Sequence, residues 1–298
     1  MRKINPGVIK SKLNRISEFR PSPIAGTWYQ SSPEKLASQI DGYLDEARLP
    51  EISGEVMALI APHAGHRYSG RTAGHAFACV RGQKRDLVVV VSPMHAPYPG
   101  ALLTSAHRAY ATPLGPVWID SIALAQLDDL LAQEGQALSP VANDKEHSLE
   151  IELPFLQRAL QGDFQLLPVM IRSQSPQAVR RLGHALAQVM QGRNGLLVAS
   201  TDLSHFYPGE IANELDQEML SRMRSLAPDD LFEAERSGKG FACGVAAVAA
   251  VLWAAKEMGA DQVEILHHST SGDETGDYAS VVGYGAAAVL CPAGTRQA

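Results

Sequence analysis

Three predicted strands of this sequence each lead directly into a polar turn. The first side chains after them that could do chemistry are His63, His95, and Asp202 with His205. In open α/β sheets the carboxyl ends of the strands line the ligand crevice. A single histidine after a strand is usually structural. The repetition at three strand ends gives a functional site the same weight as a structural role.

The histidines point to metal chemistry. Neutral imidazoles bind iron, copper and zinc, and a proline shortly before each of His63 and His95 stiffens its turn. Two histidines do not complete a metal site, and an anionic ligand is expected beside them. The residues leave four candidates for it: Cys243, Glu150, Asp202 and Asp273.

Cys243 opens a long Ala-rich helix. The positive end of a helix favours a thiolate, which is the form of cysteine that binds metal. Alternatively, Cys243 is a small buried side chain, as we expect for Cys79 and Cys291. Three scattered cysteines do not form a disulfide scaffold, so they indicate a reducing compartment and predict a cytoplasmic protein.

A second polar cluster, His147 and Glu150, lies at the start of a predicted helix over 146–160. Residues three apart share one face of a helix. One interpretation makes His147 an acid/base group or substrate contact that Glu150 orients. The alternative is an ordinary acidic helix start.

The segment 269–278 is rich in turn-forming residues, so it is either a loop over a pocket or a solvated connection. His267 and His268 precede it at the end of a predicted strand. Adjacent strand residues point to opposite faces, so at most one of them reaches a given site.

These groups need a scaffold, and strands alternate with helices along the chain. This order predicts an α/β layered fold with a mostly buried central sheet and helices on both faces. The predicted strands are 56–60, 87–91, 164–171, 195–199, 263–266 and 280–290, and the predicted helices are 32–47, 69–80, 124–131, 146–160, 177–190, 213–223 and 243–258.

Composition excludes several classes of function. The chain has 298 residues, a net charge of -6, and 45% apolar residues, which is typical of a globular protein. Its mild acidity argues against nucleic-acid binding. The uncharged run 241–255 is shorter than the about 20 residues that span a membrane. Motifs for P-loop phosphoryl transfer, Rossmann hydride transfer and zincin proteolysis are absent from the sequence.

Residues 1–21 contain six basic residues and one acidic residue, which leaves a net charge of +5. No apolar segment follows, so this stretch is not a secretory signal. We predict a solvated basic N-terminal extension over 1–21 and a single α/β domain over 22–298.

An ordered set of short motifs resembles the Memo family, whose bacterial members are named AmmeMemoRadiSam system protein B. No single motif is specific, but together they follow the family order over about residues 22–292. The matching segments are 25–29, 61–65, 93–95, 146–150, 200–205, 243–244 and 280–285.

The resemblance implies a fold like that of class III extradiol ring-cleaving dioxygenases. It also implies metal ligation by His63, His95 and Cys243, with the cysteine in place of the usual carboxylate. Those dioxygenases hold Fe(II), whereas a thiolate, which is softer than a carboxylate, would favour Cu(I), Zn(II) or a different electronic state of iron. The expected metal is therefore Fe(II) or copper, with zinc as a further option. By the same resemblance His205 is the acid/base group.

Other residues follow from the same reading of the sequence. We expect Asp202 and His147 to join His205 in the catalytic set, and Glu150, His66 and Trp28 to line the substrate pocket. The family usually has an aromatic residue where this chain has His66.

Two functions are therefore expected. The first is a metal-dependent oxidoreductase that acts on a small phenolic or enediol substrate. The second is a module that handles metal, or binds a ligand or phosphopeptide, in the same pocket without turnover. The family label also implies a pathway link to a radical-SAM protein. No nucleic-acid or membrane partner is expected.

Overall fold

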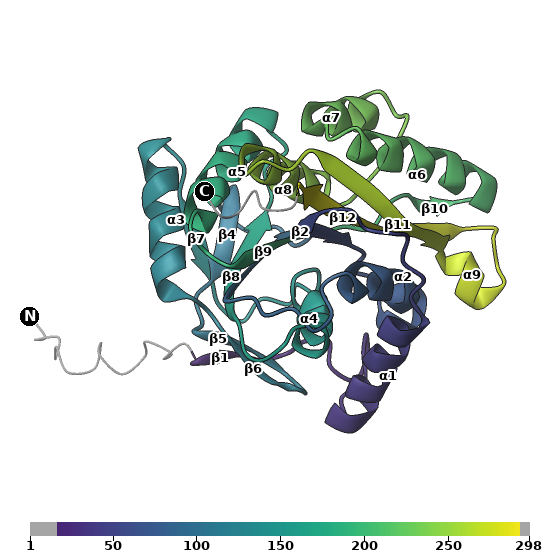
Figure 1. The fold of residues 1–298 in the computed structure, drawn as a ribbon, viewed down its shortest axis with the longest axis horizontal. Coiled ribbons are helices and arrows are strands. Elements are labelled where there is room, and N and C mark those ends of the chain that lie inside the picture. Colours follow the sequence, from purple (N-terminus) through teal and green to yellow (C-terminus); the bar gives the residue numbers. More distant parts are fainter. Residues whose placement is uncertain (1–16, 293–298) are drawn as a thin grey trace, which may run out of the picture.

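The computed structural model describes residues 17–292. It confirms the predicted α/β fold, a large mixed sheet with helices on both faces (Figure 1). The nine-stranded sheet has the order β10 (His205–Tyr207), β12 (Val281–Cys291), β2 (Glu55–Ala61), β9 (Gly195–Ser200), β3 (Leu87–Pro93), β8 (Gln165–Ile171), β4 (Leu102–Ser105) and β7 (Leu138–Val141). The ninth strand, β11 (Gln262–Thr270), pairs with β12 on the side away from β2.

Parallel pairing is confined to the middle of the sheet and one edge. The central strands β2 (Glu55–Ala61), β9 (Gly195–Ser200), β3 (Leu87–Pro93) and β8 (Gln165–Ile171) run parallel. β4 and β7 are parallel to each other, but β4 is antiparallel to β8. The outer strands β10, β11 and β12 pair antiparallel. Adjacent parallel strands end at the same side of a sheet, so the turns after β2, β9 and β3 are neighbours.

The sheet separates two apolar cores, and β3 shows how the sequence supplies both. Leu87, Val89 and Val91 pack into the core on one face, whereas Val88 and Val90 pack into the core on the other. A strand alternates its side chains, so a continuous β-branched run suits a strand that is covered twice.

Helices cover each face. The first core is closed by α3 (Ser121–Gln133), α5 (Pro176–Met190), α6 (Gly209–Arg224), α7 (Pro228–Arg236) and α8 (Val245–Glu257). The second core is closed by α1 (Pro33–Glu46), α2 (His66–Ala78) and α4 (Leu153–Ala159).

Local signals set several of these boundaries. Ser32 caps α1 by accepting the backbone N–H of Lys35, and Pro33 occupies the first helical position. Leu36, Ile40 and Leu44 then repeat at helical spacing and are buried. α1 therefore forms where its cap and its apolar face predict it.

The structure adds elements that the sequence did not predict. A separate three-stranded sheet has the order β1-β5-β6, and helix α7 was also missed. The added strands are β1 (Phe19–Arg20), β4 (Leu102–Ser105), β5 (Ala109–Thr112), β6 (Gly115–Trp118), β7 (Leu138–Val141) and β10 (His205–Tyr207). The strands predicted over 263–266 and 280–290 are present as β11 (Gln262–Thr270) and β12 (Val281–Cys291).

The predicted helix over 146–160 is wrong in its first part. A 3-10 turn spans Glu150–Glu152, and α4 begins only at Leu153, with Pro154 in its first turn. Residues 145–147 have no regular secondary structure, and 148–149 form a turn that leads into the 3-10 helix. His147 and Glu150 therefore do not share a helical face, and the local reason is that proline is favoured at a helix start.

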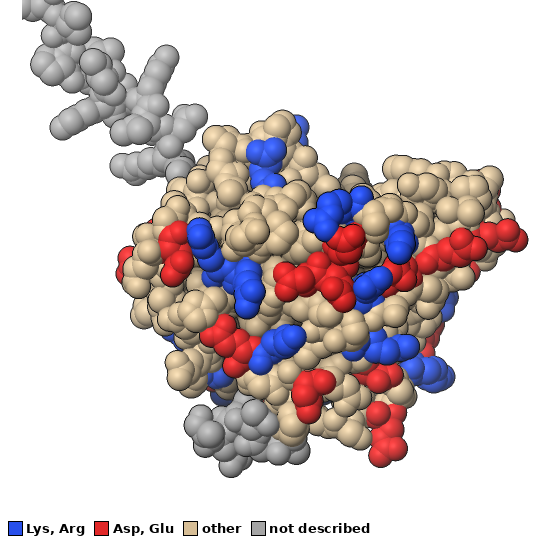
Figure 2. All heavy atoms as spheres, turned by 90° about the horizontal axis from the view of Figure 1, so that it is seen from above, with Lys and Arg blue, Asp and Glu red and all other residues tan. Residues whose placement is uncertain are grey.

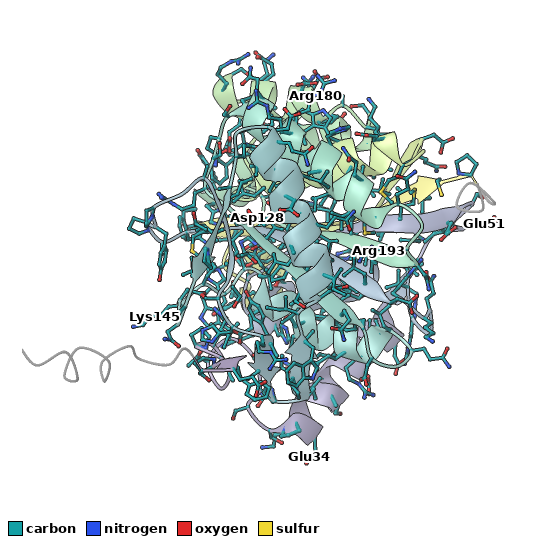
Figure 3. All side chains as sticks on the ribbon, turned by 90° about the vertical axis from the view of Figure 1, so that its left-hand side faces the viewer. Glu34, Glu51, Asp128, Lys145, Arg180 and Arg193 are labelled. Atoms are coloured by element: carbon teal, nitrogen blue, oxygen red, sulfur yellow. The ribbon has the colours of Figure 1, made fainter. Side chains whose placement is uncertain are left out.

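The surface carries charges of both signs. Figure 2 shows Lys and Arg interspersed with Asp and Glu on the face that is uppermost in Figure 1. Within residues 17–292, no helix is long and apolar enough to cross a membrane. Figure 3 labels Glu51, which precedes β2, and Lys145, next to Glu146, on opposite sides of the molecule.

Candidate metal centre

The polar turns after β2 and β3 meet across β9, which lies between the two strands. His63 follows β2, His95 follows β3, and their ring centroids are 5.4 Å apart. His63 is almost fully buried, whereas the side chain of His95 is about 40% exposed. The two rings thus form a boundary between the protein interior and an open space.

His147 is the third member of the group. Its ring stacks on that of His95 at a centroid distance of 4.9 Å, and it lies 5.5 Å from that of His63. Ligand atoms of these three histidines lie within 4.8 Å of one another. Within residues 17–292 they are the one group of three or more His, Cys, Asp or Glu side chains that meets this distance.

Glu146 holds two of these rings. Its Oε1 accepts a hydrogen bond from Nδ1 of His95 at 3.0 Å and lies 3.2 Å from Nδ1 of His147. Burial alone would raise the pKa of Glu146, but hydrogen bonds from His95 and from the Ser148 backbone outweigh it and hold the pKa below its usual range. An ionised carboxylate behind a ligand ring fixes its tautomer and direction.

Ser200 holds the third ring. Its hydroxyl donates to the Ser148 carbonyl at 2.6 Å, so its oxygen is free to accept the Nδ1 proton of His63 at 2.9 Å. Glu152 Oε1 lies 2.7 Å from the same hydroxyl, and burial raises the pKa of Glu152 well above its usual range. Hydrogen bonds thus engage Nδ1 of His63 and of His95, and Nδ1 of His147 lies near the Glu146 carboxylate.

The protonation states suit a metal site. Burial, together with the charges of His147 and His95, lowers the pKa of His63 well below its usual value. Burial lowers the pKa of His147 to about 4, whereas the hydrogen bond to Glu146 raises that of His95. Two rings are neutral at neutral pH, and neutral imidazole is the ligand form that iron, copper and zinc bind.

Asp202 orients the turn that carries His63. Its Oδ1 accepts the backbone N–H groups of His63 at 2.8 Å and Ala64 at 3.2 Å. Its Oδ2 lies 4.0 Å from His63 Nε2. Burial raises the pKa of Asp202 to about 7, so its charge is sensitive to pH.

Cys243 lies next to His63, with 3.1 Å between Sγ and Nε2. It sits in the turn before α8, and Gly244 follows it with a Cβ position only 2.4 Å from the Ser200 carbonyl oxygen. The close approach of glycine to β9 is what brings the thiol to the site. Burial and the Asp202 carboxylate raise the pKa of the Cys243 thiol, so the expected thiolate is not favoured until a metal displaces its proton.

The structure therefore groups the predicted ligands differently. His63 and His95 lie together with His147, to which the sequence reasoning gave a catalytic role, whereas Cys243 contacts His63 and is outside this group of three. In the sequence, the polar neighbours Glu146 and Ser148 on either side of His147 were the available indication of a site. Contacts with distant strands decide that His147 lies beside the other two histidines.

A cleft of about 670 Å³ opens over the histidines. His63, His95, His147 and Asp202 line it together with aromatic side chains, which are Trp28, Tyr68, His205, Phe206 and Tyr284. Ser271, Thr275 and Asp277 complete one wall, so the turn-rich segment after β11 forms part of the cleft and contains helix α9 (Ser271–Thr275).

His205 and Trp28 both line this cleft. The Nδ1 atom of His205 donates to the Leu203 carbonyl at 2.8 Å, and burial lowers the pKa of the ring. In the neutral ring the proton therefore lies on Nδ1, and Nε2 is free to accept another. Trp28 packs on His147 at a centroid distance of 4.1 Å.

His66 and Glu150 do not line the cleft, which corrects their prediction as pocket residues. His66 is 2% exposed and packs against Tyr29 and Phe155. Glu150 is fully buried and pairs with Arg20, so it does not orient His147. Both residues are close to site residues in the sequence, but their side chains do not reach the cleft.

The other predicted histidine pair also lies elsewhere. His267 contacts Thr72 of α2, with 2.9 Å between Nδ1 and Oγ1, whereas His268 contacts Asp216 of α6 at 2.9 Å. The two rings point to opposite faces of the sheet, as strand alternation requires.

Comparison with known proteins supports the family resemblance. Residues 20–288 match the family described as Memo-like protein. The chain is 30% identical to a MEMO1 family protein of Nitrosopumilus maritimus and 34% identical to one of Methanopyrus kandleri, and each alignment covers 90% of this chain and 98% or 97% of the relative. A crystal structure of an uncharacterized Escherichia coli protein has a similar fold, with a TM-score of 0.51, 15% sequence identity, and coverage of 78% of this chain and 99% of that one.

Proposed function

This chain belongs to the Memo-like protein family, and we propose that it is a metal-dependent oxidoreductase of the dioxygenase type. The metal is Fe(II) or copper, and the substrate is a small phenol or enediol. The observation that carries this proposal is the convergence of His63, His95 and His147 beside an open aromatic cleft, with Nδ1 of each ring close to a side-chain oxygen.

The donor set fits such a metal. Three imidazoles with second partners are ligands of Fe, Cu and Zn. Cys243 and Asp202 lie close enough to His63 to supply an anionic ligand or to balance the charge of the ion. When bound, the metal would supply Lewis-acid and redox chemistry at this position.

The chain's own residues account for substrate binding and proton transfer. Trp28, Tyr68 and Phe206 provide flat apolar walls for a ring-shaped substrate. His205 Nε2 can accept the proton that a phenolic hydroxyl releases, because Nδ1 is already bonded to the Leu203 carbonyl. Asp202 keeps the His63 turn in place through two backbone N–H groups.

The cleft chemistry favours a small phenol over a phosphorylated ligand. Among the described residues that line it, Asp202 and Asp277 are acidic and none is Lys or Arg. Recognition of phosphate normally uses arginine or lysine. A phosphopeptide therefore lacks a charged partner inside this cleft.

The metal site is tested by anaerobic loading of the protein with Fe(II), Cu(I) and Zn(II), each followed by elemental analysis. We expect about one equivalent in the wild type and a loss in His63→Ala, His95→Ala and His147→Ala. The matched control is His184→Ala, since His184 is an exposed histidine of α5 that pairs with Glu257 of α8. Wild-type protein that is folded and reduced but takes no metal would refute the proposal.

The enzymatic part is tested separately by oxygen uptake with catechol as probe substrate. We expect uptake with the loaded wild type and a loss in His205→Gln, with metal content unchanged. Full metal loading without oxygen uptake, with Cu(I) bound most tightly and Cys243→Ser reducing its affinity, would instead support metal handling. The thiol beside His63 is the observation that favours this second candidate.

A further inference from the structure

We propose that Arg20 is a positioning residue for the metal centre, and that the N-terminal strand of the domain thereby holds the turn that carries His147. This inference rests on the proposed metal site. Arg20 lies at the start of the family match and was counted in the sequence with the solvated basic extension. In the structure it is 1% exposed.

The guanidinium of Arg20 is surrounded by acceptors from one segment. Its Nε and Nη2 atoms donate to the two carboxylate oxygens of Asp144 at 3.0 and 2.6 Å. Nη2 also donates to the Glu146 carbonyl at 2.6 Å, and Nη1 donates to the Glu150 carboxylate. The Tyr110 ring packs against the guanidinium at 4.9 Å. The planar guanidinium of arginine, with its five N–H donors, fits this arrangement of acceptors, whereas the ammonium group of a lysine does not.

These contacts continue directly to the histidines. Asp144 Oδ1, which Arg20 binds, also accepts the backbone N–H of Glu146 at 3.1 Å. The backbone of Glu146 is thus fixed at both its N–H and its carbonyl. Its side chain in turn accepts the Nδ1 proton of His95 and the backbone N–H of His147. Arg20 therefore sets the position from which Glu146 orients two of the three proposed ligands.

Glu150 extends the same network to the wall of the cleft. Its Oε1 accepts hydrogen bonds from Ser22 and from the Tyr29 hydroxyl. Tyr29 is the neighbour of Trp28, whose ring packs on His147. One buried network therefore fixes the ligand turn and the aromatic side chain that covers it.

The strand that brings Arg20 to this place is anchored separately. Phe19 and Arg20 of β1 pair with Ala109 and Tyr110 of β5 (Figure 1). His107 adds a second link, because its Nδ1 donates to the Ser17 carbonyl at 2.7 Å and its Nε2 accepts the Asn143 N–H at 3.0 Å. The N-terminal strand and the ligand turn are thus joined at two points.

The experiment uses the full chain and Co(II), whose visible spectrum reports ligand number and geometry. Arg20→Met alone leaves two buried carboxylates without their cation, which can prevent folding. The informative variant is therefore the triple change Arg20→Met, Asp144→Asn, Glu150→Gln, which removes all three charges together. Arg20→Lys keeps the positive charge and removes the planar guanidinium. Arg108→Met is the matched control, because Arg108 pairs with Glu18 at the surface beside the same strand.

We expect the triple variant to bind Co(II) about 10- to 100-fold more weakly, as changes behind metal ligands do, with a shifted spectrum. Arg20→Lys should fall between it and the wild type, and Arg108→Met should match the wild type. A folded triple variant with the affinity and the spectrum of the wild type would overturn the role of Arg20.

A second measurement needs no metal. The backbone N–H groups of His95 and Ser148 donate to the Glu146 carboxylate, so we expect their hydrogen exchange to be at least tenfold faster in the metal-free triple variant and unchanged in Arg108→Met. If the wild-type protein takes no Co(II), exchange decides the role of Arg20 by itself, and the proposed function is refuted only when Fe(II), Cu(I) and Zn(II) are not bound either. Unchanged exchange in the triple variant would refute that role.

Discussion

Glu146 binds His95 at two atoms, although 51 positions separate them in the chain. Its Oε2 accepts the backbone N–H of His95 at 2.6 Å, and its Oε1 accepts Nδ1 at 3.0 Å. The same Oε1 accepts the backbone N–H groups of His147 and Ser148. One buried carboxylate therefore ties the turn after β3 to the turn that carries His147.

The first prediction concerns this carboxylate. Glu146→Gln removes the negative charge behind His95 and His147, so we expect metal to bind about 10- to 100-fold more weakly. Competition with a chelator measures the affinity. Glu214→Gln, an exposed change on α6, should leave it unaltered. Equal affinities in the wild type and Glu146→Gln would contradict the role of Glu146.

A second prediction concerns the pH dependence of stability. Burial lowers the pKa of His66 to about 4, and among the described residues its Nδ1 has no hydrogen-bond partner. The unfolded chain takes up a proton near pH 6.5 that the folded chain resists. The stability from His66 is therefore complete above pH 6.5 and decreases as the pH falls toward 4, by about 2 kcal/mol at pH 5.

His66→Phe removes this pH-dependent contribution to stability and keeps an aromatic ring packed against Tyr29 and Phe155. Urea unfolding of metal-free protein at pH 7 and pH 5 should show a smaller difference between the two pH values in this variant than in the wild type. The exposed change His184→Phe serves as the control. The same difference in His66→Phe and the wild type would show that His66 does not titrate in this way.

The third prediction concerns two glycines whose replacement by alanine should change the stability of the protein in opposite directions. A Cβ at position 244 would lie 2.4 Å from the Ser200 carbonyl oxygen and 2.7 Å from Cβ of Thr201, whereas a Cβ at position 42 in α1 meets nothing within 4 Å. Gly42→Ala should stabilise the protein by about 0.5–1 kcal/mol. Gly244→Ala should destabilise it, by about 1–3 kcal/mol, and displace Cys243. Chemical denaturation measures both, and a neutral Gly244→Ala would mean that the turn can move at no cost.

The fourth prediction separates substrate binding from metal binding. Trp28 is 37% exposed and packs on His147, and Trp118 is 38% exposed on β6. Trp28→Leu should weaken the binding of catechol to the metal-loaded protein by about two- to tenfold, since one aromatic contact contributes about 0.5–1.5 kcal/mol. Metal content should stay constant. Trp118→Leu should change neither quantity, and an equal loss in both variants would exclude a specific role for Trp28.

The sequence determined the features that depend on neighbours in the chain. The continuous apolar run of β3 is sufficient to predict a strand covered on both faces, and Ser32 with Pro33 is sufficient to predict the start of α1. The polar turns after β2, β3 and β9 were visible because a strand and the turn after it are local patterns. Their convergence follows once the strands are parallel and adjacent.

The tertiary structure decided which side chains meet. In the sequence, Arg20 is only one of the charges in a basic stretch. Its buried partners Asp144 and Glu150 are 124 and 130 positions away, so the sequence does not indicate them. His147 and Glu150 are three residues apart, yet a turn sends one to the cleft and the other to Arg20. Local propensity describes short segments, whereas the direction of a side chain is set by buried partners that must satisfy its charge.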